Sequence, residues 1–490
     1  MKLNLKHTLK KVLFISIFIQ LITLSFTVAQ TKTEQIDILM NLYHEYGQFN
    51  GSALVAENGK VIYKKGLGFA NMEWDITNQP DTKHRLGSIT KQFTSMLIMQ
   101  LVEQGKLKLD VPITTYLTDY PKSSGDKITI HHLLTHTAGI PSYTSFPKFF
   151  KDHARNPYTP DEFVKVFKDS TLQFTPGEKF AYSNSGYFLL GVIIEKVSGK
   201  TYEQMLQKNI FTPLKMNNTG FDHHRTILKN RATGYSKFGT LYTNSGYLDM
   251  SIPYAAGSMY STVEDLYLWD QALYTDQLIS KKSKDLIFTP DTSTGKASYG
   301  YGWGINHQPL GKSNDSIKVI GHSGGINGFN TIISRIPSDK HLIVLLNNTG
   351  RTDLKQMSRS ISSILYGAAY DNPKKSVAFS LLGVIMDKGI SSGLEEFEKI
   401  KASETYALDE IEMNRVGYQL IRVNKVKEAI EVFRLNVASF PESGNAYDSL
   451  GEAYLKDGNK ELAIKNYKKS VEIDPNNTNG AKVLKELQSE

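Results

Sequence analysis

Apolar residues near the start of the chain recur at the spacing of one helix face. In residues 33–46 they are Ile36, Leu39, Met40 and Tyr43. This spacing is the period of an amphipathic helix. Residues 89–104 show the same pattern over a longer stretch, and Gly105 follows at a position where helices commonly end. The pattern therefore predicts helices over 33–46 and 89–104.

Short runs of β-prone residues lie on both sides of a longer, mostly helical stretch. Two such runs, 51–57 and 61–63, flank Asn58-Gly59 and form the signal of a β-hairpin. Three more runs follow at 317–320, 329–336 and 342–346, ahead of a helical pattern over 353–366. Their short connections favour antiparallel pairing. We therefore predict an α+β fold, in which an antiparallel sheet flanked by helices is interrupted by a mainly helical subdomain.

The C-terminal part repeats with a period of 34 residues. The matching pairs are Gly417 and Gly451, Ala429 and Ala463, Phe433 and Tyr467, and Pro441 and Pro475. This order resembles the tetratricopeptide repeat, in which small residues let paired helices approach and aromatic residues fill the seam. An unrelated helical hairpin is the alternative. Because stable arrays need about three repeats, we expect helices in 376–402 to support an all-α repeat domain and a last helix near 481–487 to cap it.

The composition is that of a globular protein with more than one core. The chain has 490 residues, of which 40% are hydrophobic and 22% charged, so two or more domains are expected. The net charge of +8 includes Lys2, Lys6, Lys10 and Lys11, and without these four lysines it is +4. That value is small for this length, so the composition gives no reason to expect nucleic-acid binding.

The first 29 residues have the three parts of a secretory signal peptide. The four lysines precede an apolar stretch over 12–28, and Thr27-Val28-Ala29 offers small residues for cleavage before Gln30. We therefore expect export to the periplasm or out of the cell. An uncleaved membrane anchor is the alternative, although the stretch is short for a bilayer span. The chain has no cysteine, so it has no disulfide framework.

A serine followed three positions later by a lysine places a hydroxyl and an amine one helical turn apart. Such a lysine can take the serine proton when burial lowers its pKa. The spacing occurs at Ser88–Lys91, Ser124–Lys127, Ser145–Lys148 and Ser293–Lys296. Only Ser88 follows a short extended run and opens a strongly apolar helix, where the helix dipole and free N–H groups are available. On local grounds alone, a simple helix cap is the alternative.

Two further motifs follow this pair along the sequence. Tyr182-Ser183-Asn184 precedes a long apolar run, although Tyr-x-Asn also occurs at 242–244 and 370–372. His322-Ser323-Gly324-Gly325 lies between two β-prone runs. A strand edge made of small residues lets a substrate approach closely and offers it a backbone N–H.

The order of the three motifs resembles the serine β-lactamase and penicillin-binding protein superfamily. Ser88-x-x-Lys91, Tyr182-x-Asn184 and His322-x-Gly324 follow one another as in its class C β-lactamase and D-Ala-D-Ala carboxypeptidase branch. Flanking stretches at 128–141, 254–259 and 299–304 are also similar to this family. The resemblance covers about residues 35–368 and is specific for the family, not for a substrate.

The resemblance implies catalytic roles for three side chains. Ser88 attacks a carbonyl and becomes acylated. Lys91 and Tyr182 handle the serine proton and return a proton to the leaving group. For base catalysis near neutral pH, one of these two groups needs a pKa well below its ordinary value of about 10.

The resemblance also implies a set of binding groups. Asn184 forms a hydrogen bond with the substrate amide or with the lysine. Ser323 and Gly324 contact the substrate. The backbone N–H groups of Ser88 and Gly325 form an oxyanion hole, in which one donor typically contributes about 3 kcal/mol.

The third motif commonly begins with lysine, and here it begins with His322. A lysine would hold a substrate carboxylate with a permanent charge, whereas histidine is largely neutral at pH 7. The resemblance therefore implies a hydrolase that forms an acyl-serine from an amide, peptide or ester. It would be a D-Ala-D-Ala carboxypeptidase, D-aminopeptidase, esterase or weak β-lactamase. The alternative is a catalytically inactive module that binds peptidoglycan or a partner.

The remaining expectations concern metals, partners and domain limits. His132 and His136 could share a helix face, but no third ligand has a suitable spacing, so neither a metal nor a cofactor is expected. The expected partners are a small-molecule or peptide substrate, such as a cell-wall peptide, and a protein or peptide bound to the repeats. The expected limits are 1–29 for the signal peptide, 30–370 for the hydrolase domain, 371–405 for a helical linker and 406–490 for the repeat domain.

Overall fold

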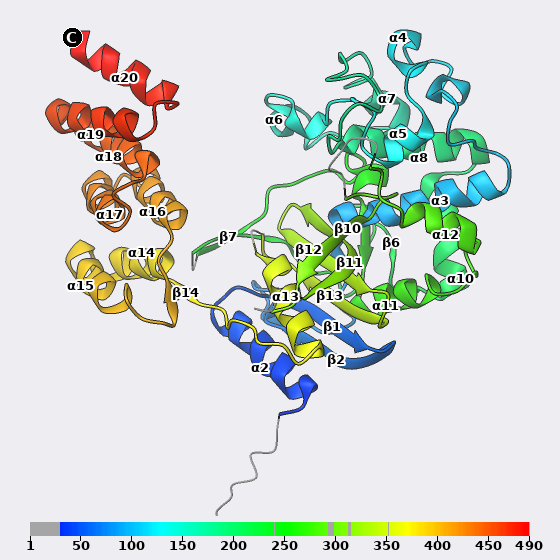
Figure 1. The fold of residues 1–490 in the computed structure, drawn as a ribbon, viewed down its shortest axis with the longest axis horizontal. Helices are drawn as coiled ribbons and strands as arrows, with labels where there is room; N and C mark the ends of the chain where they lie inside the picture. The colour runs from blue at the N-terminus through cyan, green and yellow to red at the C-terminus, as the bar shows by residue number, and fades with distance from the viewer. Residues whose placement is uncertain (1–29, 240, 293–297, 312–314, 351, 490) are drawn as a thin grey trace, which may run out of the picture.

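The computed structural model describes residues 30–239, 241–292, 298–311, 315–350 and 352–489. Figure 1 shows a mixed part built around one sheet and, beside it, an array of helices formed by the C-terminal residues. The predicted α+β fold with an all-α region after it is therefore confirmed. The expected signal peptide, 1–29, lies outside the described residues. Within the described ranges, no helix is both long and apolar enough to cross a bilayer.

The central sheet has six strands in the order β10-β11-β12-β13-β1-β2, all antiparallel to their neighbours. The strands are β1 (Gly51–Glu57), β2 (Lys60–Leu67), β10 (Gly304–Pro309), β11 (Ser316–Ile326), β12 (Phe329–Ile336) and β13 (His341–Asn347). Ala53 of β1 pairs with Leu345 of β13, so the helical subdomain is inserted between two halves of one sheet, as predicted. Asn58 and Gly59 both have positive φ, 51° and 77°, which closes the expected β1–β2 hairpin.

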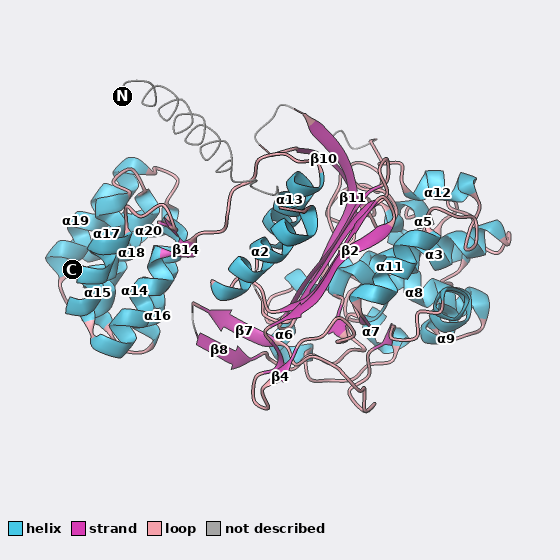
Figure 2. Cartoon of the chain, turned by 90° about the horizontal axis from the view of Figure 1, so that it is seen from below, coloured by secondary structure: helices cyan, strands magenta, loops and turns pink. Residues whose placement is uncertain are grey.

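The sheet is buried on both faces. On β13, Val344 faces the helical subdomain, whereas Ile343 and Leu345 pack under α2 (Lys32–Glu45) and α13 (Leu354–Leu365). Because side chains alternate along a strand, β13 is a continuous apolar run with two different sets of neighbours. Figure 2 shows α2 and α13 on one side of the sheet and the helical subdomain on the other.

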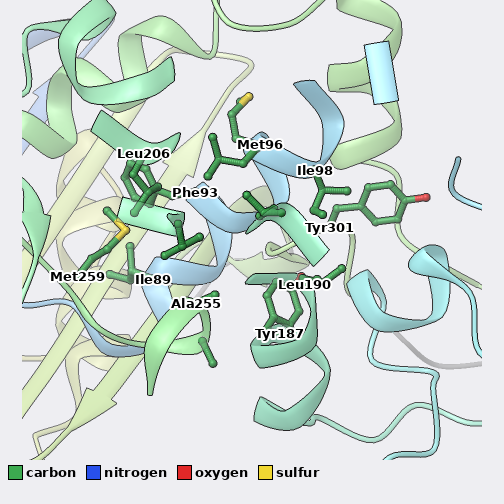
Figure 3. Close-up of a cluster of buried hydrophobic side chains, with 14 of the residues drawn as sticks. Ile89, Phe93, Met96, Ile98, Tyr187, Leu190, Leu206, Ala255, Met259 and Tyr301 are labelled. Atoms are coloured by element: carbon green, nitrogen blue, oxygen red, sulfur yellow. The ribbon is translucent and has the colours of Figure 1, made fainter. Parts of the chain in front are cut away.

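Helix α3 (Thr90–Glu103) is the centre of the helical subdomain. Each of its residues from Thr90 to Leu101 is buried. Phe93 stacks on Trp269 of α11 (Val263–Ala272), with 4.3 Å between ring centroids, and α8 (Asn184–Ser198) packs against the same helix. Figure 3 shows Phe93 and Met96 among the buried side chains around α3. A helix enclosed in this way fixes the position of the residues at its start.

The other elements of this part are short. The helices are α4 (Lys122–Gly125), α5 (Ile130–Leu134), α6 (Phe149–His153), α7 (Pro160–Val164), α9 (Tyr202–Leu206), α10 (Thr212–Leu214) and α12 (Lys281–Ile287). The strands are β3 (Phe69–Asn71), β4 (Ile76–Thr77), β5 (His84–Arg85), β6 (Gly220–Phe221), β7 (Tyr235–Phe238), β8 (Leu241–Asn244) and β9 (Met259–Ser261). Strand β5 leads directly into η1 (Gly87–Ile89), the turn before α3.

The C-terminal array is a stack of antiparallel helix pairs. After β14 (Lys375–Ser376) its helices are α14 (Val377–Lys388), α15 (Ile390–Ile400), α16 (Glu410–Arg422), α17 (Val426–Ser439), α18 (Gly444–Lys456), α19 (Lys460–Ile473) and α20 (Thr478–Ser489), with β15 (Tyr406–Ala407) between α15 and α16. Helices α14 and α15 lie in the segment expected as a helical linker and share a core with α16 and α17. They therefore support the repeats, as expected, and α20 packs on the last pair.

The repeated glycines and aromatic residues meet each other in this stack. A Cβ on Gly417 would lie 2.4 Å from the ring of Phe433, and a Cβ on Gly451 would lie 3.1 Å from the ring of Tyr467. Any larger residue would push the paired helices apart. The 34-residue period therefore reflects a seam in which each glycine makes room for an aromatic ring.

Candidate active site

Ser88 lies in η1, immediately before α3. Ser88 is half-buried, while α3 behind it is buried from Thr90 to Leu101, so the hydroxyl stands at the edge of a rigid element. Gly87 has φ of +55°, and a Cβ there would lie 2.9 Å from the backbone nitrogen of Gly325. Glycine at position 87 therefore lets η1 lie directly against β11.

Lys91 follows Ser88 by one turn and is completely buried. Its Nζ lies 3.1 Å from Ser88 Oγ, 2.9 Å from Asn184 Oδ1 and 2.8 Å from the carbonyl oxygen of Ala256. Burial holds the pKa of Lys91 well below its ordinary value. A neutral amine has two N–H donors and one lone pair. The oxygens of Asn184 and Ala256 accept the two N–H groups, so the lone pair remains for the hydroxyl proton of Ser88.

Tyr182 lies beside Lys91, in the segment that leads into α8. Lys91 Nζ stands over the Tyr182 ring, 4.9 Å from its centroid. Although 38% of the Tyr182 surface is exposed, desolvation raises the pKa of its phenol above the ordinary value, and a hydrogen bond with Ser88 offsets only part of this effect. Tyr182 therefore keeps its proton at neutral pH, whereas Lys91 readily loses one. The arrangement makes Lys91 suitable as a base and Tyr182 suitable as a proton donor.

Asn184 is the first residue of α8, and Ser183 caps that helix. Asn184 Oδ1 accepts the hydrogen bond from Lys91, while Nδ2 donates to Thr144 Oγ1 at 3.3 Å. Its backbone N–H donates to Ser142 Oγ at 3.2 Å. Of the two contacts that the family resemblance left open for Asn184, the contact with the lysine is present.

The third motif lies on β11, beside η1. Ser323 and Gly325 are exposed, and Gly324 between them is buried. A Cβ on Gly324 would lie 1.9 Å from the carbonyl oxygen of Leu86, which also accepts a hydrogen bond of 2.7 Å from Thr331 Oγ1. Only glycine allows this approach, which places the third motif against the first. The second motif meets the first through the contacts of Lys91 with Asn184 and Tyr182.

His322 is held in a single neutral tautomer. Its Nδ1 lies 2.6 Å from the carbonyl oxygen of Ser323, and since a carbonyl only accepts, Nδ1 carries the proton. Its Nε2 lies 2.9 Å from Tyr299 Oη and therefore accepts from the phenol. Burial lowers the pKa of His322 to about 3. The strand thus presents a neutral ring where the commonest family pattern has a charged lysine.

The expectation that His132 and His136 could share a helix face is wrong. Helix α5 contains His132 but ends before His136, which has φ of +60° and is buried. The backbone turns sharply there, so the two imidazoles face different surroundings. In the part of the chain that the structure describes, no group of three His, Cys, Asp or Glu residues could hold a metal ion.

Sequence reasoning missed the contact between His136 and the Tyr182 segment. The centroids of the His136 and Tyr182 rings lie 4.2 Å apart. His136 Nδ1 accepts a hydrogen bond of 3.1 Å from the backbone N–H of Ser183. The carbonyl oxygen of His136 accepts one of 2.9 Å from the backbone N–H of Ala181. His136 therefore holds the residues on both sides of Tyr182. His136 and Tyr299 lie in the flanking stretches 128–141 and 299–304 that resemble the family. No other feature of the sequence pointed to a role for either residue in the site.

Two of the other Ser-x-x-Lys pairs serve local turns. Ser124 Oγ donates to the carbonyl oxygen of Pro121 at 3.2 Å, and Ser145 Oγ donates to that of Ser142 at 2.7 Å. Ser293 and Lys296 lie outside the described residues. The contact between serine and lysine that catalysis requires is present at Ser88 and Lys91.

Two cavities border the site. The first, of about 110 Å³, is lined by Ser88, Asn184 and Gly325 and by apolar residues that include Phe150, Leu248 and Ile252; we call it the apolar cavity. The second, of about 560 Å³, is lined by Tyr182, Tyr299, His322 and Ser323 and by Lys355 and Arg359 of α13; we call it the polar cavity.

Comparison with known proteins points in the same direction as this geometry. The Beta-lactamase family model matches residues 37–365, and the Tetratricopeptide repeat model matches residues 444–477. A penicillin-binding protein of Bacillus subtilis (strain 168) is 32% identical over 369 residues, which cover 71% of this chain and 79% of that protein.

Solved structures show the same likeness. The penicillin binding protein from Bacillus halodurans has a TM-score of 0.56 and 27% identity, over 67% of this chain and 98% of that one. The D-stereospecific amidohydrolase from Streptomyces sp. has a TM-score of 0.53 and 28% identity, over 63% of this chain and 92% of that one. The matched region of this chain contains the site described above.

Proposed function

This chain belongs to the beta-lactamase family and is a serine hydrolase with a C-terminal tetratricopeptide repeat, and from that premise we propose how it acts. Ser88 is the nucleophile, Lys91 is its base, and the substrate is an amide, peptide or ester. The observation that carries this proposal is the contact of a completely buried amine, Lys91 Nζ, with Ser88 Oγ at 3.1 Å.

Acylation follows from the positions of three side chains. Ser88 Oγ attacks the carbonyl carbon of the substrate, a C–O bond forms, and the hydroxyl proton passes to Lys91 Nζ. When the tetrahedral intermediate collapses, the bond to the leaving group breaks. Tyr182 gives its proton to the departing amine or alcohol and takes one from Lys91. Positioned acid–base groups of this kind typically contribute about 10²–10⁴-fold in rate.

Deacylation uses the same groups in reverse. Water attacks the acyl-serine as its proton passes to Lys91, and Ser88 Oγ then leaves with a proton as the carboxylic acid is released. In both steps the backbone N–H groups of Ser88 and Gly325 stabilise the oxyanion. The close approach of Gly87 to Gly325 supports this pairing of donors.

The neutral state of His322 bears on the substrate. Lysine at this position would bring a permanent charge to a substrate carboxylate, whereas His322, whose pKa is lowered by burial, is neutral at pH 7. We therefore propose hydrolysis of a peptide, amide or ester, such as a cell-wall peptide, and weak activity towards β-lactams. Among the described residues that line the polar cavity, the lysine and the arginine are Lys355 and Arg359, both from α13.

A covalent probe tests the proposal. A fluorophosphonate or a fluorescent penicillin is expected to label the purified protein and to leave Ser88→Ala unlabelled. Ser124→Ala, which alters another Ser-x-x-Lys pair, is the matched control and should label like the wild type. Equal labelling of Ser88→Ala would place the nucleophile elsewhere. A folded protein without any labelling would favour the inactive binding module.

Two further parts of the proposal concern location and partners. The sequence of residues 1–29 supports export to the periplasm or out of the cell, and N-terminal sequencing of the exported protein would show whether it begins at Gln30. The stacked pairs α16–α17 and α18–α19 support binding of a protein or peptide, because such arrays present extended surfaces to their ligands.

A further inference from the structure

The walls of the apolar cavity carry no charge. Leu248 and Ile252 are buried and form its inner side, Ile326 of β11 adds a third aliphatic chain, and Phe150 stands at its mouth with 52% of its surface exposed. None of the described residues that line this cavity is acidic or basic. The space next to Ser88 is therefore bounded mainly by hydrocarbon.

The two cavities receive opposite ends of a substrate. In the proposed reaction Tyr182 gives its proton to the leaving group, and Tyr182 lines the polar cavity but not the apolar one. The leaving group therefore occupies the polar cavity. The acyl group, which stays attached to Ser88, extends into the apolar cavity beside Gly325.

The polar side chains at the apolar cavity are already engaged with other protein groups. The Tyr143 hydroxyl donates to the carbonyl oxygen of Ile252 at 3.1 Å. The amide of Asn184 contacts Lys91 and Thr144, and Asn327 Nδ2 donates to the carbonyl oxygen of Gly246 at 2.6 Å. A charged group that enters this cavity would lose its water and find no counter-ion, which is strongly unfavourable.

We propose that Ser88 accepts uncharged, apolar acyl groups and that the apolar cavity selects them. The inference rests on the proposed function and names the substrate class of the same site. The volume of about 110 Å³ is smaller than the roughly 150 Å³ of an apolar cavity that binds benzene. A branched aliphatic group fits inside, and a larger aromatic acyl group extends past Phe150 at the mouth.

Esters that share one leaving group separate acyl selectivity from leaving-group effects. We expect p-nitrophenyl isobutyrate and p-nitrophenyl phenylacetate to show kcat/KM values at least 100-fold above that of the p-nitrophenyl monoester of succinic acid. The spontaneous release of p-nitrophenol, which the free carboxylate of the succinate ester accelerates, is subtracted from each rate, and the activity is checked for loss in Ser88→Ala. The ratio of the corrected values is the measure of selectivity.

Substitutions in the cavity wall should change this ratio. Leu248→Lys places an ammonium on the inner side and is expected to lower the ratio of isobutyrate to succinate at least tenfold. Phe150→Lys should act in the same direction from the exposed mouth, where the change is compatible with folding. Ile227→Lys is the matched control, because Ile227 is 93% exposed and lines neither cavity, and it should keep the wild-type ratio.

The outcomes separate this inference from the proposed function. Ser88-dependent hydrolysis that treats succinate and isobutyrate alike would overturn the inference and leave the proposed function standing. A ratio that Leu248→Lys, correctly folded, and Phe150→Lys both leave unchanged would show that selection occurs elsewhere. Absence of Ser88-dependent hydrolysis with every ester would overturn both.

Discussion

The phenol of Tyr299 donates a hydrogen bond of 2.9 Å to Nε2 of His322. Together with the contact between Nδ1 and the Ser323 carbonyl oxygen, it gives both ring nitrogens a hydrogen-bond partner. Burial lowers the pKa of His322, so the residue that opens the third motif is neutral at pH 7 and positions a substrate without attracting a negative charge.

Lysine at position 322 should improve recognition of carboxylates. We expect His322→Lys to increase the rate of acylation by a fluorescent penicillin about tenfold, since a charge near a bound carboxylate is readily worth about 1.4 kcal/mol. His322→Gln, which stays neutral, is the control. Equal acylation of the two variants would show that the β-lactam carboxylate is bound elsewhere.

The pH dependence of acylation should report the lowered pKa of Lys91. The neutral amine is the active base, so kcat/KM is expected to rise with pH and to be lost as pH falls through this pKa. The midpoint should lie well below the ordinary lysine value of about 10.4, because burial lowers it.

Catalysis should fail when Lys91 is replaced by a side chain that cannot lose its proton. Arginine stays protonated at all accessible pH values, so Lys91→Arg should reduce acylation about 10²–10⁴-fold. Single-turnover labelling would measure this loss. A variant with nearly full acylation would exclude Lys91 as the base.

His136 is expected to act as a positioning residue for Tyr182. An asparagine side chain tolerates the φ of +60° found here and could still accept from the Ser183 N–H, so His136→Asn should lose less than about tenfold in kcat. His136→Phe keeps an aromatic ring but no acceptor, and its kcat should fall about 10–100-fold, in line with a lost buried hydrogen bond and a displaced Tyr182. KM should change little in either variant.

Unfolding measurements distinguish this role from a purely structural one. If both His136 variants lose the same free energy of unfolding but only His136→Phe loses kcat, the effect passes through Tyr182. If kcat falls equally in His136→Asn and His136→Phe, the hydrogen bond accepted by His136 Nδ1 does not position Tyr182.

Stability should fall on mild acidification because of buried neutral histidines. His84 is fully buried, and burial lowers its pKa from 6.5 to about 4. Between these values the unfolded chain binds the extra proton, so this contribution is complete above pH 6.5 and lost as pH falls towards 4. The loss is about 1.4 kcal/mol per pH unit, or about 3 kcal/mol in total.

Denaturant unfolding at pH 7 and pH 5 would measure this effect. His84→Gln should show a smaller decrease between the two pH values than the wild type. His307→Gln is the matched control, since His307 lies exposed on β10, and it should keep the wild-type decrease. An unchanged decrease in His84→Gln would assign the acid sensitivity to other groups.

The sequence predicted those features that depend on local periodicity. The turn-long spacing of Ser88 and Lys91, the hairpin at Asn58-Gly59 and the seam of Gly417 with Phe433 all follow from patterns within a few residues or one repeat. The contacts of Tyr182 and His322 with the nucleophile required the family resemblance, because no local rule brings these segments together.

The missed features depend on tertiary structure. His136 turns away from α5 because its φ is positive, which no local pattern indicated, and its partners come from residues 181–183. Whether Lys91 or Tyr182 has the lowered pKa depends on how deeply the folded chain buries the amine. The sequence left that choice open, and the complete burial of Lys91 decides it.

The pairing of β1 with β13 joins the two ends of the hydrolase domain. Gly51 pairs with Asn347, so the contact order of the sheet is high, and we expect its closure to be a slow step of folding. A chain that has not closed the sheet already contains Ser88, Lys91, Tyr182 and His322. It lacks the contact that anchors β12, and through it β11, to β1. Acyl labelling of Ser88 during refolding would therefore report completion of the sheet.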